Sequence, residues 1–549
     1  MEYFRPKWSG KKNHFAYSKL KLTSIYIFKD GITSMKRLLL GILSIVLLIS
    51  CTVKSETPTD TEQTVLKIGA IKDFKRSLEG STLVFDTLLQ MTLDYKPLPN
   101  IITEWTRNDT ATEYHLTIRD DILFSDGTPL TAQTVKWDIE NVAPITYCVF
   151  SSLLKEVSIT DTMHLKISLT APYYFLPQDL ALVTAIKENG VDEALNITDF
   201  IGTGAYILKE YDEGQSASLI KNENYWNKAA APSIPQVEWL VITDDNARNS
   251  ALSSGQIGVL GISEHYLSIQ YPLIDDLIKA KKMSFFEEPK DAFTSLMTIS
   301  FNWKEGFCSD KALREALEYG INRQALVDTV FFGIPQASGH QFNPAFTDGP
   351  QNEKPYTYNP EFSKTRLAEA GYRDSDNDGV LEKDGKKVSL KFLISSKEDY
   401  QRDLAVFIKS ELHKLRIDCE IIQVTGEAMR EHFKTGNYDL AVSHPWYEPI
   451  IGTVTYFGFD DNYTDYGLSY AINAKSVEAA RALVESATEE QIKTYAGALW
   501  KEQYEQCVTL PLCTSSRMAI FNPRFEGFRF NGNVYRIDLS GVKLRTEKR

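Results

Sequence analysis

Four acidic side chains lie close enough together in the sequence to bind one metal ion. Asp374, Asp376 and Asp378 occupy alternate positions, a glycine follows them, and Glu382 comes four residues after the last aspartate. Carboxylates at the first, third and fifth places, with glycine at the sixth, have the spacing of a calcium-binding loop. Such loops carry a bidentate acid at the twelfth place, where this chain has Gly385. The sequence therefore leaves two interpretations open, a structural calcium site and a helix-to-strand turn without an ion.

The cysteine at position 51 follows a segment that is typical of a secretory signal. Residues 35–50 read MKRLLLGILSIVLLIS, in which Lys36 and Arg37 precede an apolar run too short to span a membrane. The end of this segment, with Cys51, resembles the lipobox of bacterial lipoproteins, in which the cysteine thiol is diacylated before cleavage. Two or more acyl chains give a stable membrane anchor. The resemblance implies lipidation of Cys51, and the alternative is an uncleaved signal anchor with an incidental cysteine.

The segments on either side of this signal show no pattern of a folded domain. Residues 1–34 carry many basic side chains and precede a complete signal that begins at Met35, so we interpret them as a start site placed too early. Residues 51–64 are polar and rich in threonine, which predicts a flexible, lipidated tether. Removal of residues 1–50 takes away nine basic and two acidic side chains and changes the formal net charge from −13 to −20. Such an acidic chain is not expected to bind nucleic acid.

Catalytic chemistry has little support in the sequence. There is no nucleophile elbow, HExxH metal motif, Walker loop or dinucleotide-binding glycine turn, and the eight histidines show no ligand spacing. Five cysteines follow Cys51, and their spacing fits neither a metal ribbon nor a redox motif. We therefore expect a protein that is not an enzyme. Whether Cys507 and Cys513 form a disulfide stays open.

The elements that must position these residues alternate between short strands and amphipathic helices. Residues 113–118 alternate between apolar and polar and predict a strand. Apolar residues at helical spacing predict helices over 313–321 and 404–415. The second helix lies between alternating segments at 388–394 and 417–421, which together predict a βαβ unit with parallel strands. This order of elements predicts an α/β fold.

Five segments, in order, resemble the family 5 extracellular solute-binding proteins of ABC importers, the peptide- and nickel-binding family. The segments are TIRDDILFSDGTPLTA at 117–132, IGTGAY at 201–206 with NENYW at 222–226, LREAL at 313–317 with INR at 321–323, YNP at 358–360 with AGY at 370–372, and GNYDL at 436–440. Ala205 and Gly258 depart from the family pattern, which usually has proline and aspartate there. In the first segment, Thr131 also predicts the N-cap of a helix. The resemblance extends over residues 65–549.

The resemblance implies a two-lobed periplasmic-binding-protein fold of type II, with an extra subdomain on lobe I. Lobe I would contain residues 65–288 and 515–549, and lobe II residues 289–514. The chain would cross between the lobes near Glu288-Pro289 and again near Leu510-Pro511-Leu512. Hinge closure would then enclose the ligand, because the ligand favours the closed form.

Within the family, these segments resemble the nickel-binding branch most closely. That branch holds a metal–chelator complex with arginines on the chelator's carboxylates, with aromatic side chains, and in some members with a histidine. Here residues 145–148 and 183–187 contain no arginine, and the loop after Trp446 offers Tyr463 and no histidine. The ligand is therefore either a peptide or a metal–chelator complex such as nickel, and its identity stays open.

Most side chains expected to contact the ligand are aromatic. They are Tyr147, Phe150, Tyr173, Tyr174, His444, Trp446, Tyr447, Glu448 and Tyr463. By resemblance to peptide-binding members, Glu448 would pair with the α-amine of a ligand, and a solvated surface acid is the alternative. Trp446 could equally be a core aromatic, and His444 a structural histidine. Tyr173 and Tyr174 are neighbours on an expected strand, so at most one of them faces a cleft.

These features predict an extracytoplasmic solute-binding lipoprotein without catalytic activity. It would be a monomer, anchored by its lipid in the cell membrane, facing the periplasm or the cell exterior. It would deliver its ligand to the permease subunits of an ABC importer. The alternative is a surface adhesin, interaction or sensor protein that keeps the fold without uptake, because the expected arginines are missing. Structural calcium is the one cofactor that the sequence suggests.

Overall fold

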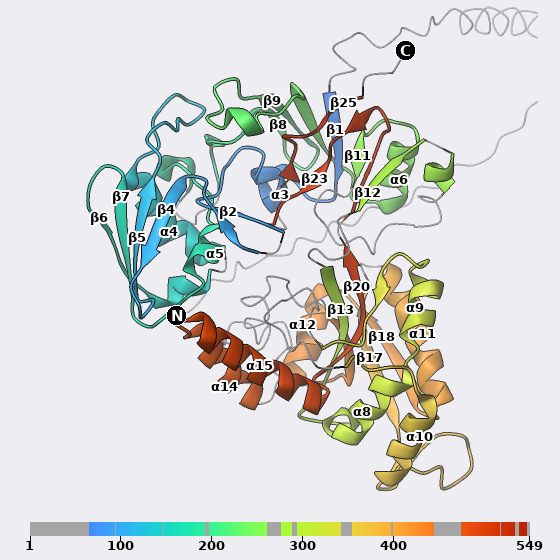
Figure 1. The fold of residues 1–549 in the computed structure, drawn as a ribbon. Helices are drawn as coiled ribbons and strands as arrows, with labels where there is room; N and C mark the ends of the chain where they lie inside the picture. Colours follow the sequence, from blue (N-terminus) through green and yellow to red (C-terminus); the bar gives the residue numbers. More distant parts are fainter. Residues whose placement is uncertain are drawn as a thin grey trace, which may run out of the picture. The chain divides into compact units, whose positions relative to one another are not determined.

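Among the residues that the structure describes, three sheets of four or more strands carry the fold (Figure 1). They belong to one compact unit, Thr64–Arg549. The computed structural model describes residues 65–93, 95–146, 148–192, 197–260, 276–280, 282–287, 294–341, 354–396, 399–443, 474–516, 518–532 and 537–545.

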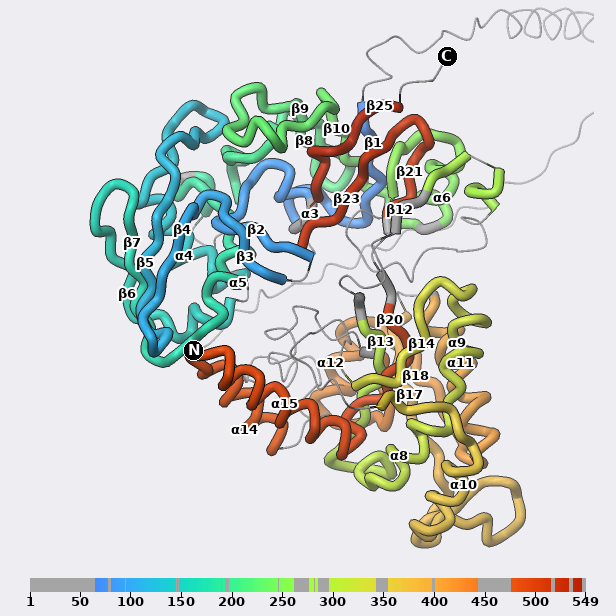
Figure 2. The backbone as a smooth tube through the Cα atoms, in the orientation of Figure 1, coloured from blue at the N-terminus to red at the C-terminus, as the bar shows by residue number. Residues whose placement is uncertain are grey.

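The seven-stranded sheet joins strands from distant parts of the chain. Its order is β12 (Ser284–Glu287), β21 (Met518–Phe521), β11 (Val259–Leu260), β1 (Val65–Ala70), β10 (Gln236–Val241), β9 (Ser216–Lys221) and β8 (Tyr206–Asp212). Strand β1 pairs in parallel with β10 and β11, whereas β21 pairs antiparallel with β11 and β12. Figure 2 shows β21, near the red end of the colour bar, beside segments coloured green. The sheet therefore needs the C-terminal part of the chain for its completion.

The four-stranded antiparallel sheet lies in the first half of the sequence. Its order is β4 (Ile102–Arg107), β5 (Glu113–Ile118), β7 (His164–Leu169) and β6 (Leu154–Ile159). The strand predicted at 113–118 is confirmed, and its apolar side chains are buried in alternation. Helix α4 (Ala132–Ile145) begins after Thr131, whose hydroxyl accepts the backbone N–H of Thr134 at 3.3 Å, as predicted for the N-cap. Helix α5 (Leu176–Leu180) follows β7.

The six-stranded sheet contains the predicted βαβ unit. Its order is β14 (Gln336–Ala337), β20 (Thr509–Ser516), β13 (Thr294–Phe301), β19 (Leu440–Ser443), β17 (Ser389–Ser395) and β18 (Asp418–Val424). Strands β17 and β18 pair in parallel and are joined by α11 (Asp399–Lys414), which confirms the prediction. Leu510-Pro511-Leu512, near which a lobe crossing is expected, lie inside β20, and the next strand, in the seven-stranded sheet, begins at Met518. The lobe boundaries stay a prediction.

The remaining elements are helices and short two-stranded sheets. The helices are α3 (Leu78–Ser81), α6 (Asp245–Ser253), α8 (Lys311–Gly320), α9 (Arg323–Val330), α10 (Pro360–Glu369), α12 (Gly426–Thr435), α14 (Ala474–Val484) and α15 (Glu489–Gln506). The two-stranded sheets are β2 (Gln90–Met91) with β3 (Pro97–Leu98), β15 (Glu382–Lys383) with β16 (Lys386–Lys387), β22 (Phe525–Glu526) with β25 (Lys543–Leu544), and β23 (Arg529–Phe530) with β24 (Ile537–Asp538). Two large hydrophobic cores result, one including β1, β5 and α4 and the other β13, β17 and α11.

A buried arginine joins α8 to the end of α15. The Arg314 guanidinium donates to the carbonyl oxygens of Gln506 at 3.0 Å and Cys507 at 3.2 Å, and also to Cys308 at 2.8 Å. Its carbon Cζ lies 3.7 Å from the ring centre of Trp303. The last carbonyls of a helix lack partners within the helix, so a cation there satisfies them and also faces the negative end of the helix dipole.

Candidate functional site

Asp86 is a buried carboxylate on which the two parts of the second sequence segment, IGTGAY and NENYW, converge. The Trp226 indole N–H donates to its Oδ2 at 2.9 Å, and the Tyr225 hydroxyl donates to its Oδ1 at 3.1 Å. The Thr203 hydroxyl donates to Oδ2 at 3.3 Å. Asp86 itself is 1 % exposed. These donors replace the water that a buried carboxylate loses. IGTGAY and NENYW are therefore joined by a side chain that the sequence analysis did not single out.

Gly202 and Gly204 allow IGTGAY to lie directly against another backbone segment. The Gly204 N–H donates to the Val84 carbonyl at 2.8 Å, and a Cβ on Gly204 would lie only 2.6 Å from that oxygen. Ser125, in the first segment, donates its N–H to the Gly202 carbonyl at 2.9 Å. The first and second segments thus meet where only glycine permits the approach.

Phe150 and Tyr173, two of the expected ligand contacts, lie in the core around Asp179. Both are 0 % exposed. The Tyr173 hydroxyl donates to Asp179 Oδ2 at 2.9 Å, and the Phe150 N–H donates to the same oxygen at 3.1 Å. Burial raises the pKa of the Asp179 carboxyl to about 7 although both hydrogen bonds lower it. These two rings therefore pack in the core of this structure, and their expected contact with a ligand stays a prediction.

Tyr174 has a half-buried side chain and contacts the helical hairpin of α14 and α15. Its hydroxyl donates to Glu489 Oε1 at 3.0 Å, and its N–H donates to the Ser486 carbonyl at 3.1 Å. The Arg107 guanidinium lies 4.6 Å from the centre of the Tyr174 ring and donates to the Ala487 carbonyl at 3.0 Å. The expected strand at residues 173 and 174 is wrong, because both precede α5 in an irregular segment. The expectation that at most one of the two side chains faces a cleft stays a prediction.

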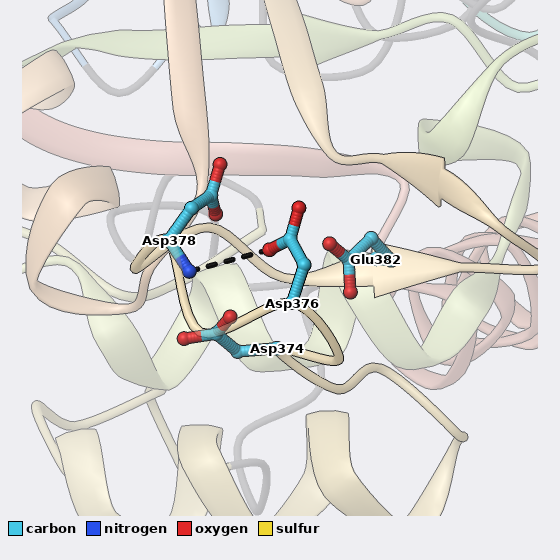
Figure 3. Close-up of side chains that lie close together, drawn as sticks. All are labelled: Asp374, Asp376, Asp378 and Glu382. Carbon is cyan, nitrogen blue, oxygen red and sulfur yellow. Dashed lines mark hydrogen bonds between the residues drawn. The ribbon is translucent and has the colours of Figure 1, made fainter.

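The four acids singled out in the sequence do lie together in the structure. Asp374, Asp376 and Asp378 lie in the loop between α10 and β15, and Glu382 is the first residue of β15 (Figure 3). Each offers one carboxylate oxygen, and these four atoms lie within 4.8 Å of one another. The Lys387 ammonium lies 3.1 Å from Asp376 Oδ2 and also contacts Asp378, whose carboxyl pKa it lowers. The loop thus concentrates oxygen ligands of the type that a hard cation prefers.

A family model connects this geometry to known proteins. The model described as "Bacterial extracellular solute-binding proteins, family 5 Middle" matches residues 96–467, more than half of the chain. The chain belongs to this family. The resemblance read from the five segments is therefore confirmed, and family 5 proteins are extracytoplasmic components of ABC importers.

Relatives of this family 5 protein include binders of different ligands. The nickel-binding periplasmic protein of Escherichia coli (strain K12) is 23% identical over 380 residues, which are 67% of this chain and 71% of that protein. The oligopeptide-binding protein AppA of Bacillus subtilis (strain 168) is 26% identical over 420 residues, 72% and 73% of the two chains. The crystal structure of NikA from Brucella suis in complex with Fe(III)-EDTA has a TM-score of 0.80 at 20% identity, and covers 88% of this chain and 100% of its own. This likeness confirms the two-lobed α/β fold.

Several predictions for this solute-binding protein fall outside the described residues. They are the ligand contacts Tyr147, His444, Trp446, Tyr447, Glu448 and Tyr463, and the lipidation site Cys51. The cysteine question is answered, because Cys507 and Cys513 are buried and form no disulfide. Within the part of the chain that the structure describes, every helix is too short or too polar to cross a bilayer.

Proposed function

We propose that this family 5 protein is a lipoprotein that captures a peptide outside the cytoplasm and delivers it to the permease of an ABC importer. The family match over residues 96–467 carries the proposal, because it includes strands of both the four-stranded and the six-stranded sheet. Proteins of this family bind solutes and are not enzymes, which supports a role without catalysis. Cys51 would carry the lipid anchor, and the protein would act as a monomer.

The surroundings of Lys187 favour a peptide over a metal–chelator complex. A chelator's carboxylates need cationic partners in a partly desolvated site. In the stretch 183–187, which the resemblance aligns with an expected arginine, Val183, Ala185 and Ile186 are buried apolar residues. Lys187 supplies the stretch's cation, and its ammonium is already paired with Asp126. This stretch therefore lacks a cation that is available to a chelator.

Glu448 is the residue that we propose as the anchor of the peptide's α-amine. A carboxylate and an ammonium in a desolvated site form a charge-assisted hydrogen bond, which orients the peptide by its N-terminus. A solvated acid at this position would contribute little to binding, because exposed ion pairs are worth about 0–1 kcal/mol. Substitution of Glu448 therefore separates the two interpretations.

Native mass spectrometry of residues 52–549, purified without chelator or refolding, tests the ligand. We expect a co-purified peptide, and a thermal shift with peptides that exceeds the shift with nickel–histidine or free metals. Glu448→Gln should lose the peptide mass, whereas Glu427→Gln, which changes an exposed acid on α12, should keep it.

The other outcomes contradict parts of this proposal. A metal–chelator mass would overturn the choice of peptide and favour the nickel-binding alternative. A protein that carries no ligand and is stabilised by none of the candidates would contradict uptake. It would favour the surface interaction or sensor protein instead.

A further inference from the structure

The acidic loop has the internal hydrogen bonds of a preformed cation site. Asp374 Oδ2 accepts the Gly379 N–H at 3.2 Å, and Asp376 Oδ1 accepts the Asp378 N–H at 3.2 Å. Asp378 Oδ1 accepts the Val380 N–H at 2.9 Å. These bonds tie the first, third and fifth acids of the loop to its backbone. Each of these three acids keeps a second carboxylate oxygen for other partners.

One carboxylate oxygen in this loop is buried without a partner. The Asp374 side chain is 7% exposed, and its Oδ1 accepts no hydrogen bond from the protein. Leaving a buried polar atom without a partner costs free energy, so such atoms in folded proteins require a physical reason. The Arg416 guanidinium lies 3.3 Å from the other carboxylate oxygen, Oδ2, and does not satisfy Oδ1. A cation bound among the acids and in contact with Oδ1 would satisfy it.

The size of the cluster matches one calcium ion. Calcium binds six to eight oxygens at about 2.3–2.6 Å, so two ligands on opposite sides of the ion lie roughly 4.6–5.2 Å apart. The ligand atoms of the four acids lie within 4.8 Å of one another. Glu382 occupies the ninth place of the loop, where calcium loops also supply a ligand. An ion bound here would have Glu382 as its ninth-place ligand and would lack the bidentate acid of the twelfth place.

We propose that Asp374, Asp376, Asp378 and Glu382 bind a calcium ion. The ion would cross-link the end of α10 to the hairpin of β15 and β16, and its role would be structural. The site does not depend on which solute the protein carries. Without a bound ion, the Lys387 ammonium neutralises part of the negative charge of the cluster, because it contacts Asp376 and Asp378. Its side chain is 51% exposed, so it can leave the acids when calcium binds.

Calcium titration of the full-length protein, solubilised in detergent and first stripped with chelator, tests this proposal. We expect saturable binding in equilibrium dialysis and a matching rise in the melting temperature. The dissociation constant should be on the order of 10⁻⁴–10⁻³ M, as in extracellular calcium modules. Magnesium at the same concentration should bind more weakly, because it requires a tighter octahedral site.

Two substitutions should change the calcium affinity in opposite directions. Asp376→Asn removes one charged ligand and should weaken binding at least tenfold. Lys387→Gln removes the competing cation and should strengthen binding several-fold. Asp384→Asn and Lys386→Gln, which change exposed neighbours in the same hairpin, should leave the affinity within twofold.

Two results would overturn the proposal. One is no calcium binding by the wild-type protein at millimolar concentration. The other is an affinity that Asp376→Asn and Asp384→Asn change equally, because nonspecific attraction to acidic surface would do the same. Circular dichroism spectra of the variants would identify any loss of folding. Absence of calcium binding would not contradict the proposed solute binding, because solute binding is measured separately, with peptides, on protein purified without chelator.

Discussion

Asp179 couples protonation to folding at the scale of a single residue. It is fully buried, its Oδ1 has no hydrogen-bond partner, and burial raises the pKa of its carboxyl from 3.8 to about 7. Between these two pKa values the folded chain keeps a proton that the unfolded chain releases. The unfolded state therefore binds fewer protons, and stability falls as the pH rises through this range. Above about pH 7 both states are ionised, and the contribution of Asp179 becomes constant.

Replacement of Asp179 by asparagine should remove this pH dependence. Asparagine keeps an oxygen to accept the Phe150 N–H and the Tyr173 hydroxyl, and it carries no charge. We expect the free energy of unfolding of the wild type, relative to Asp179→Asn, to fall between about pH 4 and pH 7. The slope at its steepest should be about 1.4 kcal/mol per pH unit.

Urea unfolding of both proteins across this pH range measures the difference. Asp109→Asn, which changes an exposed aspartate, serves as the control and should follow the wild type. Parallel curves for the wild type and Asp179→Asn would show that Asp179 does not titrate between these pH values in the folded chain.

Residue-scale features were the least predictable from sequence. Asp86 escaped notice because its partners Thr203, Tyr225 and Trp226 lie 117, 139 and 140 positions away. Phe150 and Tyr173 were placed at a ligand because the resemblance put their segments beside the cleft, and aromatic side chains serve equally well in a core. Only tertiary packing distinguishes the two roles, and no local pattern records it. The acids at 374–382 were found because their partners are also their sequence neighbours.

At the scale of elements, a helix end is completed by a side chain from elsewhere. Arg314, on α8, donates to the last carbonyls of α15 and stacks on Trp303. Lysine cannot reproduce this arrangement, because it has no planar fork of donors and stacks poorly on an aromatic ring. Several buried carbonyls would lose their partner together.

Arg314→Lys should therefore lower the free energy of unfolding by about 2–3 kcal/mol. Arg430→Lys is the matched control, because Arg430 is exposed and pairs with Glu427 on α12 at 3.4 Å. That change should stay within about 0.5 kcal/mol. Thermal and chemical denaturation of the two variants measures the difference. Equal effects would show that the carbonyls at the end of α15 do not need the guanidinium.

Elements were predictable wherever periodicity and length agreed. The unit formed by β17, α11 and β18 was found because an alternating run, a helical run and a second alternating run follow without interruption. The supposed strand at Tyr173 and Tyr174 rested on too few residues to define a period. The lobe crossing near Leu510 was implied by the family resemblance and not by a pattern in these residues. Pro511 lies within β20 opposite Thr298, at an irregularity in the pairing with β13.

At the scale of the whole molecule, the sequence predicted the family and the two-lobed fold, and it left the ligand open. The fold follows from the order of many segments, so the loss of one or two does not obscure it. The ligand depends on a few side chains, most of which lie outside the described residues. Relatives that bind nickel or oligopeptides share the fold at similar identity, so overall likeness does not discriminate between them.

Attachment to the membrane through a lipid on Cys51 is tested by the substitution Cys51→Ala, which removes the thiol. We expect wild-type protein in the membrane fraction and Cys51→Ala in the soluble extracytoplasmic fraction or as unprocessed precursor, because alanine cannot be acylated. Labelling with radioactive palmitate, followed by cell fractionation, checks this. Ser50→Ala keeps a small residue before the cysteine and should behave like the wild type. Acyl label on Cys51→Ala would show that Cys51 is not the lipidation site.

The burial of five described cysteine thiols lets their reactivity report local opening of the protein. Cys148, Cys308, Cys419, Cys507 and Cys513 are all buried, and none is in a disulfide. Burial raises the pKa of Cys419, Cys507 and Cys513 to about 12, so little thiolate exists at neutral pH. Outside the cytoplasm, where thiols are readily oxidised, the packing around them is their protection. The alkylation rate of each thiol would therefore measure how often the structure around it opens, without an added probe. Cys148 would report on the region beside α4, and Cys419 on β18.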